Sequence, residues 1–251
     1  MWSSVSLRLR ALRPQVKRDP LGGGCLRTTL AMSSSERWSW GARRLGMASS
    51  IAILIVGILY IAVITLWLII EATPREPIGD PYLAVMEVLT IASALALVGL
   101  VVAIWCFADT EHRLSALTAL AIGTLAAAFT VAVHFVQLTA VRQLWRAGGL
   151  ADYRLAWPSA LFAIEYFAWD VLVGFTLVFM SFAVAGRPGA ETARRAMLIG
   201  GGLCLVGVAG PFSGRIFLQN IGVLGYAVVL PIASALTARM FRAAVPGNAA
   251  A

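Results

Sequence analysis

The stretch that decides the fold is Ala48–Ile70, which reads ASSIAILIVGILYIAVITLWLII. It is 23 residues long and contains no charged side chain. At a rise of about 1.5 Å per residue, a helix of this length crosses the hydrocarbon core of a bilayer, which is about 30 Å thick. The stretch therefore predicts a transmembrane helix.

The composition of the whole chain is that of a membrane protein. Of the 251 residues, 60% are hydrophobic and 13% are charged, whereas soluble domains contain about 45–50% apolar and about 25% charged residues. An ordinary soluble globule is therefore excluded. The three cysteines, Cys25, Cys106 and Cys204, have no paired spacing, so neither a disulfide framework nor a zinc motif is predicted. We expect no cofactor and no metal ion.

Five further apolar runs follow the first, and short polar segments separate them. This pattern predicts an all-α polytopic membrane protein, a bundle of six transmembrane helices. The expected spans are about 48–70, 82–107, 114–141, 158–184, 196–212 and 216–240. They form a predicted transmembrane domain over 47–242, and a short disordered tail follows at 243–251.

Residues 1–46 are rich in Arg, Gly and Ser, and nine of the 20 Lys and Arg residues lie in the first 47 positions. Such a segment buries too little apolar surface to form a core, which predicts a disordered cationic tail. Met32 and Met47 are alternative translation starts, and Met47 directly precedes the first span. Two interpretations of the tail remain open: a signal that sets membrane orientation, or a segment that binds anionic lipid headgroups.

The orientation in the membrane follows from the distribution of basic residues. The two tails and the even-numbered loops contain 15 Lys and Arg residues, and the odd-numbered loops contain five. Cytoplasmic segments carry the excess of positive charge, so both termini are predicted to be cytoplasmic. The net charge of +8 then reflects topology, and the expected partner is the lipid bilayer and not a nucleic acid.

The succession of Gly79-Asp80-Pro81-Tyr82, Val133-His134-Phe135 and Trp157-Pro158 along the chain resembles small bacterial multi-pass membrane proteins. The resemblance covers roughly Met47–Arg242. It implies a bacterial inner membrane as the location, and it names no family and no functional residue.

Four ionisable residues fall inside the predicted spans: Glu87, His134, Glu165 and Asp170. Each costs roughly 2.5–3.5 kcal/mol at the centre of a membrane helix, so such residues face the bundle interior and pair with one another. Depth along the helix axis can be counted from the outer end of each span. By this count the same depth, about 8–10 Å, is shared by Glu87, His134 and Glu165, and Asp170 lies at about 18 Å. The spacing therefore predicts a polar pocket that opens to the outside.

Two amides extend this polar level. Gln137 lies three residues after His134 and shares its helical face, and Gln219 opens the sixth span on the same outer side. The six candidate residues for ligand or proton binding are Glu87, His134, Gln137, Glu165, Asp170 and Gln219.

Three functional interpretations follow. The first is a pocket that binds a proton, a cation or a small polar ligand, as in a transporter-like module, a sensor or an accessory subunit, and no enzyme. The second is a structural or partner-binding protein whose polar residues only hold helices together; the glycine-rich fifth span would then contact a membrane-protein partner or a second copy. The third and weaker one is an intramembrane metal-dependent enzyme, with carboxylates and one imidazole as ligands.

Overall fold

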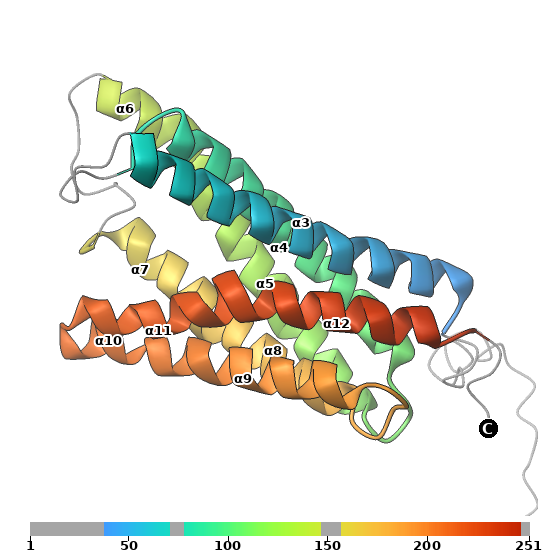
Figure 1. The fold of residues 1–251 in the computed structure, drawn as a ribbon. Helices are drawn as coiled ribbons and strands as arrows, with labels where there is room; N and C mark the ends of the chain where they lie inside the picture. The colour runs from blue at the N-terminus through green and yellow to red at the C-terminus, as the bar shows by residue number, and fades with distance from the viewer. Residues whose placement is uncertain (1–37, 71–77, 147–156, 247–251) are drawn as a thin grey trace, which may run out of the picture. The chain divides into compact units, whose positions relative to one another are not determined.

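The computed structural model describes residues 38–70, 78–146 and 157–246, and all of their regular structure is helical (Figure 1). Within these residues six helical spans are long and apolar enough to cross a membrane. They are Trp40–Ile70, Tyr82–Phe107, Arg113–Leu144, Ala160–Ala183, Glu191–Ser213 and Ile216–Ala243. The prediction of an all-α protein with six such helices is confirmed.

The first two spans are single α-helices, and the other four consist of several helical segments each. The first two are α3 (Trp40–Ile70) and α4 (Tyr82–Phe107). The third contains α5 (Arg113–Val136), the π-helical η1 (Gln137–Val141) and α6 (Arg142–Arg146). The fourth contains α7 (Ala160–Tyr166), the π-helical η3 (Phe167–Val173) and α8 (Gly174–Ala183). The fifth contains α9 (Glu191–Gly207) and α10 (Ala209–Ser213). The sixth contains the 3₁₀-helical η4 (Ile216–Gln219), α11 (Asn220–Val223), the π-helical η5 (Leu224–Val229) and α12 (Leu230–Ala243).

Two spans begin earlier than their apolar runs. α9 starts at Glu191, five residues before the predicted 196, because the Glu191 carboxylate binds Arg194 at 2.8 Å and Arg195 at 2.7 Å across one helical turn. α3 starts at Trp40, eight residues before the predicted 48. Its first turns are tied to the other end of the chain, since Arg43 Nε donates a hydrogen bond to the Phe241 carbonyl at 2.9 Å.

The predicted tails lie largely outside the described residues. Positions 1–37 and 247–251 are not described, so the predicted disorder of residues 1–46 and 243–251 remains a prediction there. α3 runs without a break through the predicted domain boundary at residue 47, and α12 ends at Ala243.

The spans form a ring in chain order (Figure 1). Each span packs against the next one along the sequence, and α12 packs against α3, which closes the ring. The described residues all belong to one compact unit of the chain, Ser33–Ala251.

Both ends of the described chain lie at the same end of the bundle. Trp38 Nε1 donates a hydrogen bond to the Ala244 carbonyl at 3.1 Å. The Trp38 ring also packs against Phe107 and Phe241, with ring centroids 4.9 and 5.1 Å apart. We call this end, which holds Trp38 and Ala244, the terminal end, and the opposite end, where α3 stops at Ile70, the far end.

Glycines bring α9 close to two neighbouring spans. A Cβ atom on Gly207 would lie 2.6 Å from the Cα of Gly222 in α11, and one on Gly201 would lie 2.7 Å from the carbonyl oxygen of Gly174 in α8. Such contacts require glycine because any side chain would push the backbones apart. The glycine face predicted to meet another subunit is therefore occupied within the chain, with Gly202 as an exception that has no neighbour within 4 Å.

The outer surface of the bundle is apolar. α3 has the fewest buried residues of the six spans, and it exposes large side chains such as Ile55, Leu66 and Ile69. A helix that is apolar on its outward face is stable where lipid and not water surrounds it. The six spans therefore imply contact with a lipid bilayer.

Candidate functional site

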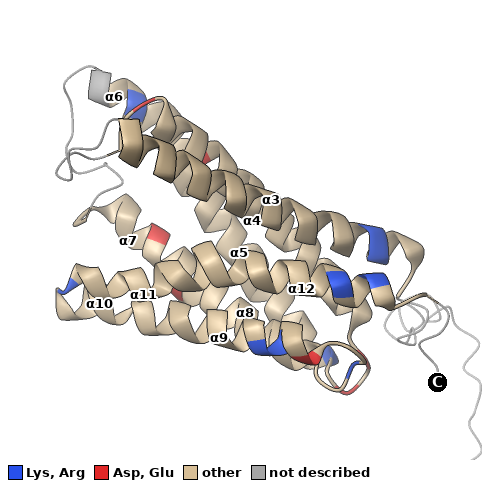
Figure 2. Ribbon diagram, in the orientation of Figure 1, with Lys and Arg blue, Asp and Glu red and all other residues tan. Residues whose placement is uncertain are grey.

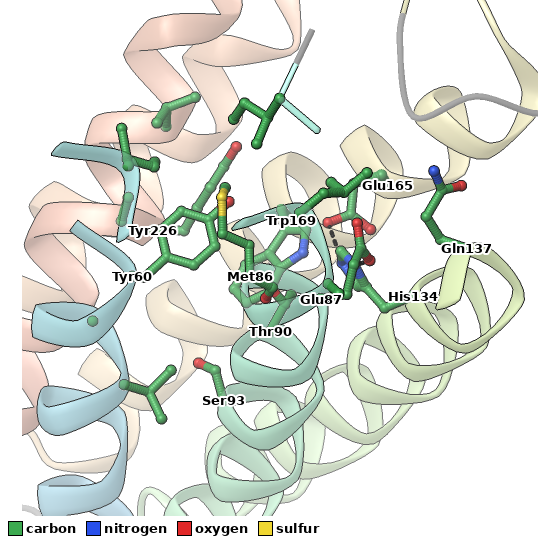
Figure 3. Close-up of a pocket in the computed structure, with 18 of the residues that line it drawn as sticks. Tyr60, Met86, Glu87, Thr90, Ser93, His134, Gln137, Glu165, Trp169 and Tyr226 are labelled. Atoms are coloured by element: carbon green, nitrogen blue, oxygen red, sulfur yellow. Dashed lines mark hydrogen bonds and ion pairs between the residues drawn. The ribbon is translucent and has the colours of Figure 1, made fainter. Parts of the chain in front are cut away.

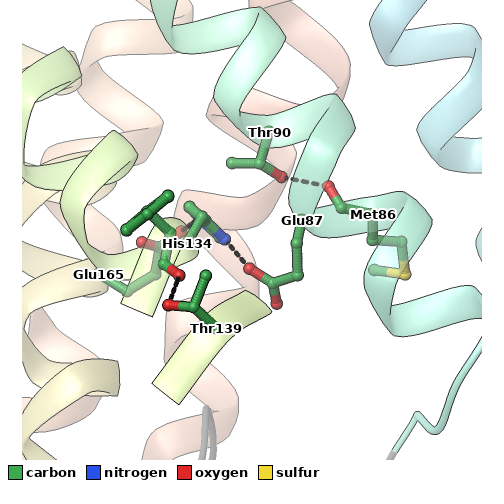
Figure 4. Close-up of polar contacts among 7 residues, drawn as sticks. Met86, Glu87, Thr90, His134, Thr139 and Glu165 are labelled. Carbon is green, nitrogen blue, oxygen red and sulfur yellow. Dashed lines mark hydrogen bonds and ion pairs between the residues drawn. The ribbon is translucent and has the colours of Figure 1, made fainter. Parts of the chain in front are cut away.

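The imidazole of His134 lies between two carboxyl groups that come from different helices (Figures 3 and 4). Nε2 lies 2.8 Å from Glu165 Oε1 of α7, and Nδ1 makes a hydrogen bond with Glu87 Oε2 of α4. Glu87 and His134 are buried, and 12% of the Glu165 side chain is exposed. We call Glu87, His134 and Glu165 the carboxyl–imidazole triad. It joins three consecutive spans.

Local helix geometry supports this arrangement. His134 lies in the last turn of α5, before the π-helix η1, and Glu165 lies in the last turn of α7, before the π-helix η3. A π-helical segment inserts extra backbone into a helix and is frequent at functional sites. In α4, Thr90 donates its hydroxyl to the Met86 carbonyl at 2.9 Å, one turn along from Glu87 (Figure 4).

With one proton in each of its two hydrogen bonds, the triad carries a net charge of −1, whichever atoms hold those protons. Its two hydrogen bonds need one proton each. These two protons make either an imidazolium between two carboxylates or a neutral imidazole between one carboxylate and one carboxylic acid, and both arrangements sum to −1. Glu165 Oε2 is buried and has no hydrogen-bond partner among the described residues. This oxygen is therefore free to take up a proton or to contact a cation.

A cavity of about 640 Å³ borders the triad (Figure 3). Five of the six spans line it, and the fifth span, with α9, does not contribute. Its walls are mainly aliphatic, and Tyr60, Trp169 and Tyr226 add aromatic rings. The ring centroids of Trp169 and Tyr226 lie 5.1 Å apart.

One further ion pair lies in the cavity wall at the far end of the bundle. Arg142 Nε is 2.7 Å from Asp80 Oδ2, and both side chains are about 40% exposed. This pair is neutral in itself. Among the described residues that line the cavity, the remaining charge is therefore that of the triad.

The two predicted amides also line the cavity. Gln219 is buried, and its Nε2 donates a hydrogen bond to the Tyr226 hydroxyl at 3.1 Å. Gln137 is buried as well, and its Oε1 has no hydrogen-bond partner among the described residues. The cavity therefore contains an unused acceptor on Gln137 in addition to Glu165 Oε2.

Asp170 is separate from this cavity. It is fully buried in η3, does not line the cavity, and packs against the backbones of Gly207 and Gly222. Neither carboxyl oxygen has a hydrogen-bond partner within 3.5 Å in the described part of the chain. Five of the six predicted candidate residues thus line one cavity, and Asp170 lies outside that lining, because its carboxyl group faces Gly207 of α9 and Gly222 of α11.

The geometry of the triad does not resemble a site in which histidine binds a zinc-type metal ion. In the parts of the chain that the structure describes, no group of three or more His, Cys, Asp or Glu residues is arranged to hold a metal ion. Both ring nitrogens of His134 face carboxyl oxygens, which leaves the imidazole no lone pair directed at a metal.

Sequence reasoning missed Tyr60 and Tyr226, which belong to the first and sixth spans. Both rings border the cavity (Figure 3). A tyrosine inside an otherwise apolar run carries a polar hydroxyl that usually finds a partner when buried. The presence of a tyrosine in an apolar run could therefore have marked both residues as candidates. It does not indicate which neighbouring span the ring contacts.

Comparison of the chain with profiles of known protein families, with curated proteins and with solved structures gave no match.

Proposed function

We propose that this multi-pass membrane protein binds a cation or a proton in the intramembrane cavity, at the carboxyl–imidazole triad. The observation that carries the proposal is a largely buried triad that has a net charge of −1 when each of its hydrogen bonds holds one proton, and whose Glu165 Oε2 has no hydrogen-bond partner among the described residues. A buried charge without compensation is costly. A bound cation removes this cost, so the cavity favours positively charged ligands.

The role in the membrane is that of a transporter-like module, a sensor or an accessory subunit, with binding and not catalysis as the primary event. The proposed location is the inner membrane of a bacterium, as the resemblance to small bacterial multi-pass proteins implies.

The proposed orientation has both termini in the cytoplasm and the cavity toward the outside. Basic residues support it (Figure 2). Of the ten arginines whose side chains the structure describes, eight belong to helix ends and loops at the terminal end, and two, Arg142 and Arg215, belong to the far end. An excess of Arg is typical of the cytoplasmic side.

One observation favours the structural alternative, in which the triad only holds helices together. Both ring nitrogens of His134 are satisfied, and the two hydrogen bonds join α4, α5 and α7. Thermal unfolding of the purified protein separates the two functions. Glu165→Gln keeps an acceptor for His134 but removes the charge, so the binding proposal expects an unchanged or higher midpoint, whereas a clearly lower midpoint supports the structural role.

Binding itself is tested with dicyclohexylcarbodiimide, an apolar reagent that modifies protonated carboxyl groups in membrane proteins. We expect modification at Glu165, located by mass spectrometry, which decreases when the pH is raised or when an alkali cation is added. The label should be lost in Glu165→Gln and kept in Glu191→Gln, a matched change on an exposed glutamate at the terminal end. No modification of Glu165 under any condition contradicts the proposal.

A further inference from the structure

The size of the cavity indicates what kind of cation it holds. A bare metal ion or a proton would fill a very small part of about 640 Å³. Cavities for organic ligands measure about 300–1,000 Å³. The cavity is therefore large enough for an organic molecule, and the triad supplies the negative charge that binds its cationic group.

The walls opposite the triad are suited to an apolar body. α3 contributes Ile53, Val56 and Ile64, and the last span contributes Val223 and Leu230. These side chains have no polar group with which to bind a hydrated ion. Burial of apolar ligand surface against them contributes about 25 cal/mol per Å².

Aromatic rings occupy the space between the apolar walls and the triad. Tyr60 lies on α3, Trp169 on η3 and Tyr226 on η5, so three spans place a ring at the cavity (Figure 3). The faces of such rings attract organic cations, and quaternary ammonium groups in particular. Trp169 and Tyr226 are in mutual contact and form a continuous aromatic surface.

The charge around the cavity is also one-sided. Among the described lining residues the arginine is Arg142, and it is paired with Asp80. An anionic ligand would therefore meet the negative triad without a free positive side chain to bind it. A neutral ligand would leave the charge of −1 uncompensated.

We propose that the ligand is a lipophilic ammonium compound, with its cationic group at Glu165 of the triad and its apolar body along α3 and the last span. This inference rests on the proposed function and narrows its ligand to an organic cation. Such a compound is amphiphilic and partitions into the bilayer that surrounds the six spans.

The experiment compares three ligands with the same chain and different charge: octyltrimethylammonium, 1-octanol and octanesulfonate. Each is titrated below its micellar concentration into the purified full-length protein, and binding is measured by calorimetry and by the shift of the thermal midpoint. We expect octyltrimethylammonium to bind about tenfold more tightly than octanol, because one desolvated contact of its cationic group contributes about this factor. Octanesulfonate should bind most weakly of the three. Equal affinities, or a preference for octanol or octanesulfonate, overturn the inference.

Two variants locate the site. Glu165→Gln should reduce the affinity for octyltrimethylammonium to that for octanol, and Glu191→Gln should leave the wild-type preference intact. Because the ligand series in the wild type needs no variant, a misfolded Glu165→Gln protein does not remove the test. A preference that persists in well-folded Glu165→Gln also overturns the inference, since the cation then binds elsewhere.

The failure of the inference is distinguishable from that of the proposed function. If carbodiimide modifies Glu165 and alkali cations suppress the modification, but none of the octyl compounds binds, the organic ligand is refuted and cation binding stands. If Glu165 is never modified, cation binding at the triad fails and the ligand class fails with it.

Discussion

Gly222→Ala tests the close packing of Asp170 against α11. An alanine Cβ at this position would lie 2.3 Å from Asp170 Oδ1 and 2.8 Å from its Cγ. Overpacking of this kind costs about 1–3 kcal/mol, and the better helix propensity of alanine offsets about 0.5–1 kcal/mol. We therefore expect Gly222→Ala to lower the free energy of unfolding by about 1–2 kcal/mol.

The cause of this loss is tested by a double-mutant cycle with Asp170→Ala. Removal of the carboxyl group should abolish the cost of Gly222→Ala. The control is Gly201→Ala, whose Cβ would lie 2.7 Å from the carbonyl oxygen of Gly174 and 3.1 Å from the N of Val178. That clash is with backbone, so Asp170→Ala should not relieve it. Gly202→Ala has no neighbour within 4 Å and should be neutral or stabilising.

The assay is reversible unfolding in mixed micelles with increasing mole fraction of dodecyl sulfate, followed by tryptophan fluorescence. Each variant is measured alone and in the Asp170→Ala background. The reasoning is refuted if Gly222→Ala costs the same in both backgrounds, because the destabilisation would then come from a contact other than the buried carboxyl group.

Two further predictions concern the ends of the bundle. Burial raises the pKa of Asp109, but the His112 N–H at 2.9 Å, the His112 ring at 2.8 Å and the charge of Arg187 outweigh it, so the pKa is lowered. A lowered pKa stabilises the folded state at pH values above the ordinary pKa of Asp, and this stability is lost as the pH falls through the folded-state pKa. Asp109→Asn should therefore lower the free energy of unfolding by less than about 1 kcal/mol at neutral pH, because this carboxyl group is a third exposed and screened by solvent. In strong acid the substitution should have no effect, and thermal unfolding measured across pH tests both expectations. In a cysteine-free background in intact cells, an impermeant maleimide should label Ser213→Cys and not Pro188→Cys; the reverse pattern refutes the proposed orientation.

The six spans were predictable because each is a predominantly apolar run of about membrane length, and such runs can be recognised without knowledge of tertiary contacts. The common depth of Glu87, His134 and Glu165 was predictable for the same reason, since residue number fixes height along a helix. The structure brings these three side chains together. The amino ends of α3 and α9 were not predictable from hydropathy, because hydrogen bonds and ion pairs extend them beyond the apolar runs.

The rotation of each helix about its axis was the part that hydropathy could not supply. A helix that is apolar on all sides has no periodic signal to show which face meets a neighbour. Asp170 was therefore assigned to the same pocket as Glu165, although its carboxyl group faces α9 and α11. The contributions of Tyr60 and Tyr226 depend on the contact of α12 with α3, which joins the two ends of the sequence.

The chemistry of the triad itself separates a helix tie from a ligand site. A tie between α4, α5 and α7 needs two hydrogen bonds to His134, and a glutamine at position 165 would still accept one of them without a charge. That neutral arrangement would avoid the cost of a negative charge inside the membrane. The chain instead has two acids, and one oxygen of Glu165 has no partner in the described residues. The second acid is more than the tie requires, and this excess is the reason why we propose a cation as its partner.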